Sequence, residues 1–184
     1  MAKVERIATP IAPQGVGQAI RQADSSLSDS TIAVLMAQYG YETGGGGSAT
    51  WNWNIGNVKH VDGDGYDYFT MTVPEGYGAN RQMLPQNFRA YPNLTTAVSR
   101  QLSLLKNGYP QAWAAAVRGS VSEFVDGLVS NPNRKYFTGD PSNYKAGMLR
   151  YFKKYGGVIA ASGSGLLVVI AGIGAYAFYK KRAF

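Results

Sequence analysis

The residues that could do acid–base chemistry in this sequence form a short list. The chain has no Cys and a single His, His60. Thiolate catalysis, disulfides, Cys-ligated zinc and a metal site built on a pair of His are therefore excluded. A Ser-His-Asp triad would have to use His60, which no partner motif accompanies. Carboxylates remain as the candidate acid and base, and we expect neither a metal nor a cofactor.

Among the carboxylates, Glu42 has the most informative surroundings. It follows the stretch 37–41, Ala-Gln-Tyr-Gly-Tyr, and precedes Thr43 and four glycines at 44–47. The glycines must end the helix that Glu42 belongs to. A carboxyl at such a junction is partly desolvated, which raises its pKa as a general acid near neutral pH requires. The alternative is an exposed Glu at a helix C-terminus, where the helix dipole disfavours negative charge.

Three further segments follow Glu42-Thr43-Gly44 in the chain. They are Asn54-Ile55-Gly56-Asn57-Val58-Lys59, Phe88-Arg89-Ala90-Tyr91 and Tyr136-Phe137-Thr138-Gly139-Asp140-Pro141-Ser142-Asn143-Tyr144. In this order they resemble the motifs of the glucosaminidase family, glycoside hydrolase family 73, and the resemblance covers about residues 31–155. It implies a lysozyme-like α+β fold that cleaves the glycan strands of peptidoglycan.

The resemblance also implies roles for individual residues. Glu42 matches the family's general acid, and Tyr136 matches its active-site tyrosine, which would position the sugar and the catalytic water. Tyr144 matches a second tyrosine, expected in the substrate-binding part of the site with a packing role rather than a chemical one. Trp53 and Asn54 would line the cleft, the indole stacking on a sugar ring and the amide reading an N-acetyl group. Core packing is the alternative for Trp53.

The sequence departs from the family pattern at three places. Asn57 stands where the family prefers Gly, and the glycines at 44–47 replace a Gly-Trp-Gly-like turn. One residue is also inserted before Asp140. The first two departures bear on the shape of the cleft rather than on the acid.

The second carboxylate is predicted in the β lobe. Glu75 lies 13 residues before Phe88, the spacing at which related sequences carry their β-lobe glutamate, and it is our first choice. The rivals are three nearby aspartates, Asp62, Asp64 and Asp67. The stretch 62–65, Asp-Gly-Asp-Gly, could equally be a polar turn. A calcium loop there would lack the bidentate Glu of the EF-hand pattern.

The elements that must position these residues follow from hydrophobic periodicity. Ser28 to Thr31 offer N-cap candidates, and apolar residues then recur at helical spacing up to Glu42. Alternation over 66–73 predicts a strand, which returns in a second strand reaching about Gln86. Helices are expected over 93–108, 111–117, 121–129 and 142–155. The fold class is therefore α+β, a mostly helical body with a small β lobe, over a domain of residues 28–155.

The sequences of the two ends of the chain predict structures outside this domain. Residues 1–27 are expected to form an N-terminal arm, extended up to about Gln22. Residues 156–179 contain no charge over 24 positions. A helix of that length reaches roughly 36 Å and could cross a ~30 Å hydrocarbon core. We expect one transmembrane helix followed by a basic tail at 180–184, the alternative being a buried hairpin of the soluble domain.

The formal net charge of +7 favours anionic partners. Five of the cations, Lys153, Lys154, Lys180, Lys181 and Arg182, flank the apolar segment. No dense basic stretch interleaved with aromatics occurs elsewhere, so no nucleic acid is expected. The expected partners are peptidoglycan strands and, through the C-terminal helix, a lipid membrane.

The leading hypothesis is an endo-β-N-acetylglucosaminidase that hydrolyses the GlcNAc-β-1,4-MurNAc bond of peptidoglycan. Glu42 would protonate the leaving oxygen. Glu75 would activate water or stabilise the oxocarbenium-like state, with a smaller role if the acetamido group of the substrate assists. The alternatives are a muramidase or lytic transglycosylase on the same fold, and a non-catalytic wall-binding membrane protein.

The cellular context is inferred from both ends of the chain. The N-terminus has no apolar run long enough for a signal peptide. With the C-terminal anchor, this favours a bacteriolytic enzyme of a phage whose virion contains a lipid membrane, where virion structural proteins would be further partners. The expected location is the virion membrane, and the alternative is the bacterial cell envelope. Lysines on both sides of the span leave both topologies open.

Overall fold

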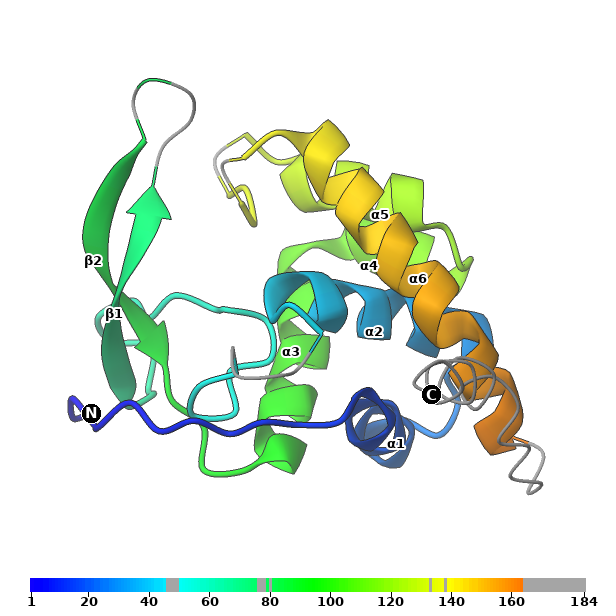
Figure 1. Ribbon diagram of the computed structural model, residues 1–184, viewed down its shortest axis with the longest axis horizontal. Coiled ribbons are helices and arrows are strands. Elements are labelled where there is room, and N and C mark those ends of the chain that lie inside the picture. Colours follow the sequence, from blue (N-terminus) through cyan, green and yellow to red (C-terminus); the bar gives the residue numbers. More distant parts are fainter. Residues whose placement is uncertain (46–49, 76–78, 80, 133, 138, 164–184) are drawn as a thin grey trace, which may run out of the picture.

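The computed structural model describes residues 1–45, 50–75, 79, 81–132, 134–137 and 139–163. Figure 1 shows a two-stranded hairpin standing beside a helical body, with the C-terminal end of one central helix directed toward the hairpin. The predicted architecture, a mostly helical body with a small β lobe, is confirmed in this part of the chain. The elements are α1 (Pro13–Ala23), α2 (Asp29–Glu42), β1 (Tyr68–Glu75), β2 (Gln82–Arg89), α3 (Leu94–Gly108), α4 (Pro110–Val117), α5 (Val121–Val129) and α6 (Pro141–Gly163).

Helix α2 is the central helix of the body. The side chain of Ser28 accepts a hydrogen bond from the backbone N–H of Thr31, as an N-cap does. Every residue from Thr31 to Gly40 is buried, so the helix is enclosed on all sides. The two ends of the helix emerge from this enclosure, Asp29 and Ser30 at its start and Glu42 at its end.

Helix α6 packs closely on α2 because glycines lie at the contact. A β-carbon on Gly147 would overlap the ring of Tyr41, and one on Gly40 would come within 2.7 Å of the rings of Tyr151 and Tyr155. The close approach brings Tyr144, near the start of α6, to the end of α2. This pairing of helices assembles the acid with its neighbours.

The hairpin of β1 and β2 is antiparallel, with a register that runs from Tyr68 opposite Arg89 to Glu75 opposite Gln82. The predicted first strand over 66–73 thus begins and ends two residues early. The N-terminal segment lies along the base of this lobe. Val4 N donates to Tyr68 O at 2.8 Å, and Thr9 N donates to Thr50 O at 2.9 Å.

The expected extended arm is wrong for part of the N-terminus, because Pro13–Ala23 forms helix α1. Val16, Ala19 and Ile20 are buried in the main core, at the i, i+3, i+4 spacing of an amphipathic helix. Pro13 opens this helix at a position where its missing N–H is not needed. Pro10, Pro13 and the small residues around them obscure that short periodicity in the sequence.

At the other end, α6 continues beyond the predicted domain boundary at 155 and reaches Gly163. Residues 164–184, which hold most of the predicted membrane helix and all of the basic tail, lie outside the described residues. Within the described ranges, no helix is both long and apolar enough to span a bilayer.

Candidate active site

Glu42 is the last residue of α2 and is partly buried. The hydroxyl of Tyr144 donates to its Oε1 at 2.5 Å. The side-chain amide of Asn57 donates to its Oε2 at 3.3 Å. Two residues from distant parts of the chain therefore hold the two oxygens of one carboxyl group.

The surroundings of Glu42 favour its neutral form. Burial raises the pKa of Glu42 to about 7, although the hydrogen bonds from Tyr144 and Asn57 lower it in part. The position at the C-terminal end of α2 also disfavours negative charge there. A carboxyl with a pKa of about 7 holds its proton at neutral pH and can still release it, which is what a general acid needs.

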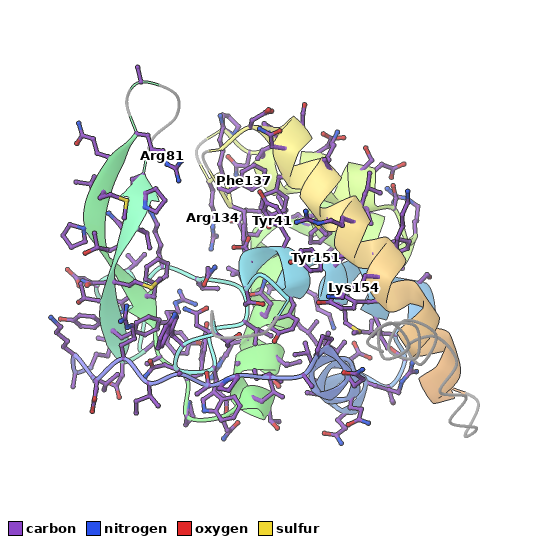
Figure 2. The ribbon with its side chains drawn as sticks, in the orientation of Figure 1. Tyr41, Arg81, Arg134, Phe137, Tyr151 and Lys154 are labelled. Atoms are coloured by element: carbon purple, nitrogen blue, oxygen red, sulfur yellow. The ribbon has the colours of Figure 1, made fainter. Side chains whose placement is uncertain are left out.

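Aromatic rings surround this carboxyl on the side of the helical body. The ring of Tyr144 lies 4.3 Å from that of Tyr41 and stacks on Phe137 at 4.1 Å. Tyr144 is buried, while Tyr41 and Phe137 are half-buried. Figure 2 places Tyr41, Phe137 and Arg134 at the end of the body that faces the hairpin. Tyr41 and Phe137 thus pack against the tyrosine that contacts Glu42.

Tyr136 lies close to Glu42 but its hydroxyl is used elsewhere. It donates to Gly56 O at 2.7 Å and accepts from Gln101 Nε2 at 3.1 Å. Burial raises the pKa of Tyr136 well above its ordinary value, and the charge of Glu42 adds to the shift. Tyr136 thus ties the segment between α5 and α6 to Gln101 of α3 and to the loop around residue 56. Tyr144 is the tyrosine that contacts Glu42. The predicted packing role of Tyr144 is therefore too limited.

The loop that faces Glu42 has an unusual backbone. Asn52, Trp53 and Asn57 have φ of +47°, +58° and +48°, and they are the non-glycine residues with positive φ in the described chain. Such conformations are uncommon outside Gly and Asn, and they concentrate at functional sites. The hydrogen bond from Asn54 N to Trp51 O closes the turn that contains the first two.

Asn54 is fully committed to holding this loop. Its Oδ1 accepts from Val58 N at 2.8 Å, and its Nδ2 donates to Val58 O at 2.9 Å and to Arg89 O at 3.0 Å. The residue is only 1% exposed. The expectation that Asn54 reads an N-acetyl group does not fit this arrangement, because the amide has no free donor or acceptor facing solvent.

Trp53 is partly buried and packs against the main core. Its backbone N–H donates to Thr9 Oγ1 at 2.9 Å, so the N-terminal segment supports it. The buried part of the indole thus packs in the core, which was the alternative role for Trp53. Stacking of the exposed part of the indole on a sugar ring stays a prediction.

Glu75 ends β1 and forms an ion pair with Lys59, whose Nζ lies 2.7 Å from Glu75 Oε1. Lys59 is two residues beyond Asn57, so their Cα atoms are at most about 7 Å apart. The short segment 57–59 therefore contacts Glu42 through one side chain and Glu75 through another. This places the first-choice carboxylate on the hairpin side of the same loop.

Two of the three rival aspartates, Asp64 and Asp67, have structural roles in the lobe. Asp64 accepts from Val61 N and Tyr66 N, pairs with Arg89 at 2.8 Å and faces His60 Nδ1 at 3.0 Å. Burial pushes the pKa of Asp64 upward, but these hydrogen bonds outweigh it and the net pKa is lowered. Asp67 accepts from Ala2 N at 2.8 Å, and the side chain of Asp62 is fully exposed. In the described ranges, no group of three or more His, Cys, Asp or Glu could hold a metal ion.

Comparison with known proteins identifies the fold. No protein-family model and no curated protein sequence matches the chain. Among solved structures, a peptidoglycan hydrolase from Sphingomonas sp. A1 is 20% identical with a TM-score of 0.59, covering 88% of this chain and 96% of that one. The glycoside hydrolase domain of FlgJ from Salmonella typhimurium is 16% identical (TM-score 0.51, 84% and 96% covered). The catalytic domain of the autolysin Auto from Listeria monocytogenes is 21% identical (TM-score 0.53, 81% and 87% covered).

The chain shares the fold of these solved domains. At identities of 16–21% the likeness establishes the arrangement of the chain, and the chemistry of the site rests on its own geometry. The structure brings Tyr144 into contact with Glu42 and places Tyr136 nearby. Sequence reasoning missed Tyr41, Phe137 and the contact of Asn57, although each adjoins or belongs to a motif already recognised.

The described part of the chain also holds a core cavity. It is small, about 20 Å³, and is lined by residues of α1, α2 and α3 and by Ile55. Gln38 and Gln101 are its polar lining residues, and Gln101 Nε2 donates to Gln38 Oε1 at 3.3 Å. Glu42 does not line this cavity, which therefore lies behind the candidate site rather than in it.

Proposed function

We propose that this protein hydrolyses the glycan strands of bacterial peptidoglycan, as an endo-β-N-acetylglucosaminidase acting on the GlcNAc-β-1,4-MurNAc bond. The observation that carries the proposal is the state of Glu42. It is a partly buried carboxyl with a pKa of about 7, held through both oxygens at the end of a central helix. A likeness to domains described as peptidoglycan or glycoside hydrolases supports the class of substrate.

The chemistry follows from the two carboxyl groups. Protonated Glu42 donates its proton to the glycosidic oxygen, and the bond to the anomeric carbon breaks through an oxocarbenium-like state. Glu75, on the hairpin across the loop 57–59, activates the incoming water or stabilises that positive charge. If the acetamido group of the substrate attacks first, water opens the resulting ring and Glu75 contributes less.

The direct test is Glu42→Gln, which keeps the shape of the side chain and removes its proton. We expect clearing of purified cell walls to fall about 10²–10⁴-fold, the usual contribution of a general acid. Glu123→Gln is the matched control, because Glu123 lies on α5, is exposed and forms an ion pair with Arg118. A Glu42→Gln protein that is folded and clears walls like the wild type would rule out this mechanism.

The bond that is cut separates the enzyme alternatives. Mass spectrometry of the soluble products should find reducing-end GlcNAc. Reducing-end MurNAc would instead identify a muramidase, and an anhydro-MurNAc end a lytic transglycosylase. Wall binding without any product would favour a non-catalytic wall-binding membrane protein.

The same proposal includes a location. The uncharged stretch 156–179, flanked by lysines, supports a C-terminal membrane anchor, and we propose that the protein serves as a lysin in the membrane of a phage virion. The full chain should float with phospholipid vesicles on a density gradient, and a chain ending at residue 163 should not. Detection in purified virions and loss on detergent extraction would support the virion role, whereas presence only in uninfected host envelope would refute it.

A further inference from the structure

Asn57 makes two contacts with the proposed acid that a glycine could not make. Its Nδ2 lies 2.6 Å from the backbone oxygen of Glu42 and 3.3 Å from Glu42 Oε2. An amide nitrogen carries two hydrogens, so each contact has its own N–H. One side chain therefore holds both the backbone and the carboxyl of the same residue.

The backbone contact matters because of where α2 ends. Carbonyls in the last turn of a helix have no partner within the helix. Thr43 N still closes the bond to Tyr39 O, and the carbonyl of Glu42 lies one turn beyond that. Asn57 supplies the missing donor and so fixes the end of the helix to the loop.

The loop in turn holds Asn57 in place. The buried amide of Asn54 makes three hydrogen bonds to backbone groups of residues 58 and 89. Asn57 adopts φ +48°, a left-handed conformation that Gly and Asn tolerate better than other residues. A left-handed residue in a braced loop directs its side chain along one fixed path, here toward Glu42.

We propose that Asn57 is a positioning residue for Glu42, holding its carboxyl between the Asn57 amide and the Tyr144 hydroxyl during proton transfer. The inference rests on the proposed function of Glu42. A hydroxyl can donate or accept, so Tyr144 stays bonded to Oε1 whether Glu42 is protonated or ionised. An amide N–H only donates, and it bonds more strongly to a carboxylate than to a neutral acid. Asn57 thus stabilises the state that follows proton transfer and lowers the pKa of Glu42.

Asn57→Gly is the sharpest variant, because Gly accepts the left-handed backbone and removes only the side chain. On a soluble GlcNAc-MurNAc oligosaccharide, we expect kcat to fall about tenfold with little change in KM, the effect of losing one hydrogen bond to a charged group. The alkaline limb of the pH profile should move to higher pH, since a donor to the carboxylate is lost. Asn57→Asp should move it further by placing a like charge beside Glu42.

Asn52→Gly is the matched control. Asn52 has φ +47°, but its side chain contacts Ile7 N and Glu5 O rather than the acid. Its replacement should leave the position of the alkaline limb unchanged, whatever it does to stability.

A direct titration separates this inference from the proposed function. The side-chain carbon signal of Glu42, followed by NMR without substrate, should titrate at higher pH in Asn57→Gly than in the wild type or Asn52→Gly. An unchanged titration and an unchanged kcat would show that Asn57 only fills a left-handed position, and would overturn the inference. Full activity in Glu42→Gln would remove the proposed function, while the titration would still report whether Asn57 holds the carboxyl.

Discussion

At the scale of single residues, Glu42 is defined by two opposing effects. Burial beside the rings of Tyr144 and Tyr41 favours the neutral acid, and the donors Tyr144 and Asn57 favour the carboxylate. The first effect is larger, so the pKa of Glu42 rises to about 7 rather than falling. The acid therefore changes its charge within the physiological pH range.

The pH profile of activity should show this titration. The active form carries the proton on Glu42, so activity should be retained below the pKa of about 7 and lost as the pH rises through it. At pH 9 about 1% of the acid form remains, and kcat/KM should be about 100-fold lower than its maximum. Initial rates on a soluble glycan between pH 5 and pH 9 would measure this pH profile. A flat profile up to pH 9 would contradict the assignment.

The two tyrosines should differ in their effect on this profile. Tyr144→Phe removes the donor to Oε1, which should raise the pKa of Glu42, shift the alkaline limb upward and lower kcat about tenfold. Tyr136→Phe removes the bond to Gly56 O and should mainly lower stability, by about 1 kcal/mol. Thermal unfolding and pH profiles of both variants provide the comparison. A larger shift of the limb in Tyr136→Phe would reverse the roles given to the two tyrosines here.

At the scale of elements, the pairing of α2 with α6 assembles the site. Gly147 lets α6 approach the ring of Tyr41, and Tyr144 on the preceding turn then reaches Glu42. A closely packed protein interior does not accept an added methyl group unless the neighbouring side chains move. The same contact therefore contributes to both stability and the geometry of the acid.

Gly147→Ala should consequently lower both the stability of the protein and its catalytic rate. We expect a loss of about 1–3 kcal/mol in the free energy of unfolding, the usual cost of overpacking, together with a fall in kcat. Gly139→Ala is the matched control, because a β-carbon on Gly139 would meet nothing within 4 Å. Denaturant unfolding and rate measurements on the two variants would test this. Equal stability of the two proteins would show that Tyr41 moves aside without cost.

At the scale of the whole molecule, the net charge of +7 should attract an anionic wall polymer over a long range. Salt shortens this range, from about 10 Å at 0.1 M to about 3 Å at 1 M. Co-sedimentation with purified walls should weaken as salt increases, and wall clearing should fall with it. The rate on a short uncharged oligosaccharide should change little. If the affinity for walls does not change with salt concentration, contacts within the candidate active site dominate binding.

The sequence alone predicted most of the elements and selected Glu42 as the candidate acid. Helical periodicity and the N-cap at Ser28 placed α2, and the glycines after Glu42 marked its end. The fold class and the positions of α3 and α5 followed in the same way, because hydrophobic spacing and capping are local properties. Helix α1 was not predicted, because Pro13 and the small residues of this helix weaken the periodic signal.

Only the tertiary structure decided how the site residues divide their roles. The hydroxyl of Tyr144 reaches Glu42 across 102 positions, while that of Tyr136 reaches Gly56 across 80. No spacing rule could tell the two tyrosines apart, because helix packing sets which hydroxyl meets the acid. Asn54 and Asn57 lie three positions apart in one motif. The side chain of Asn54 bonds to backbone groups, whereas that of Asn57 bonds to the carboxyl of Glu42. The left-handed backbone at Asn57 makes that difference, and it exists only once the loop is folded against α2 and the hairpin.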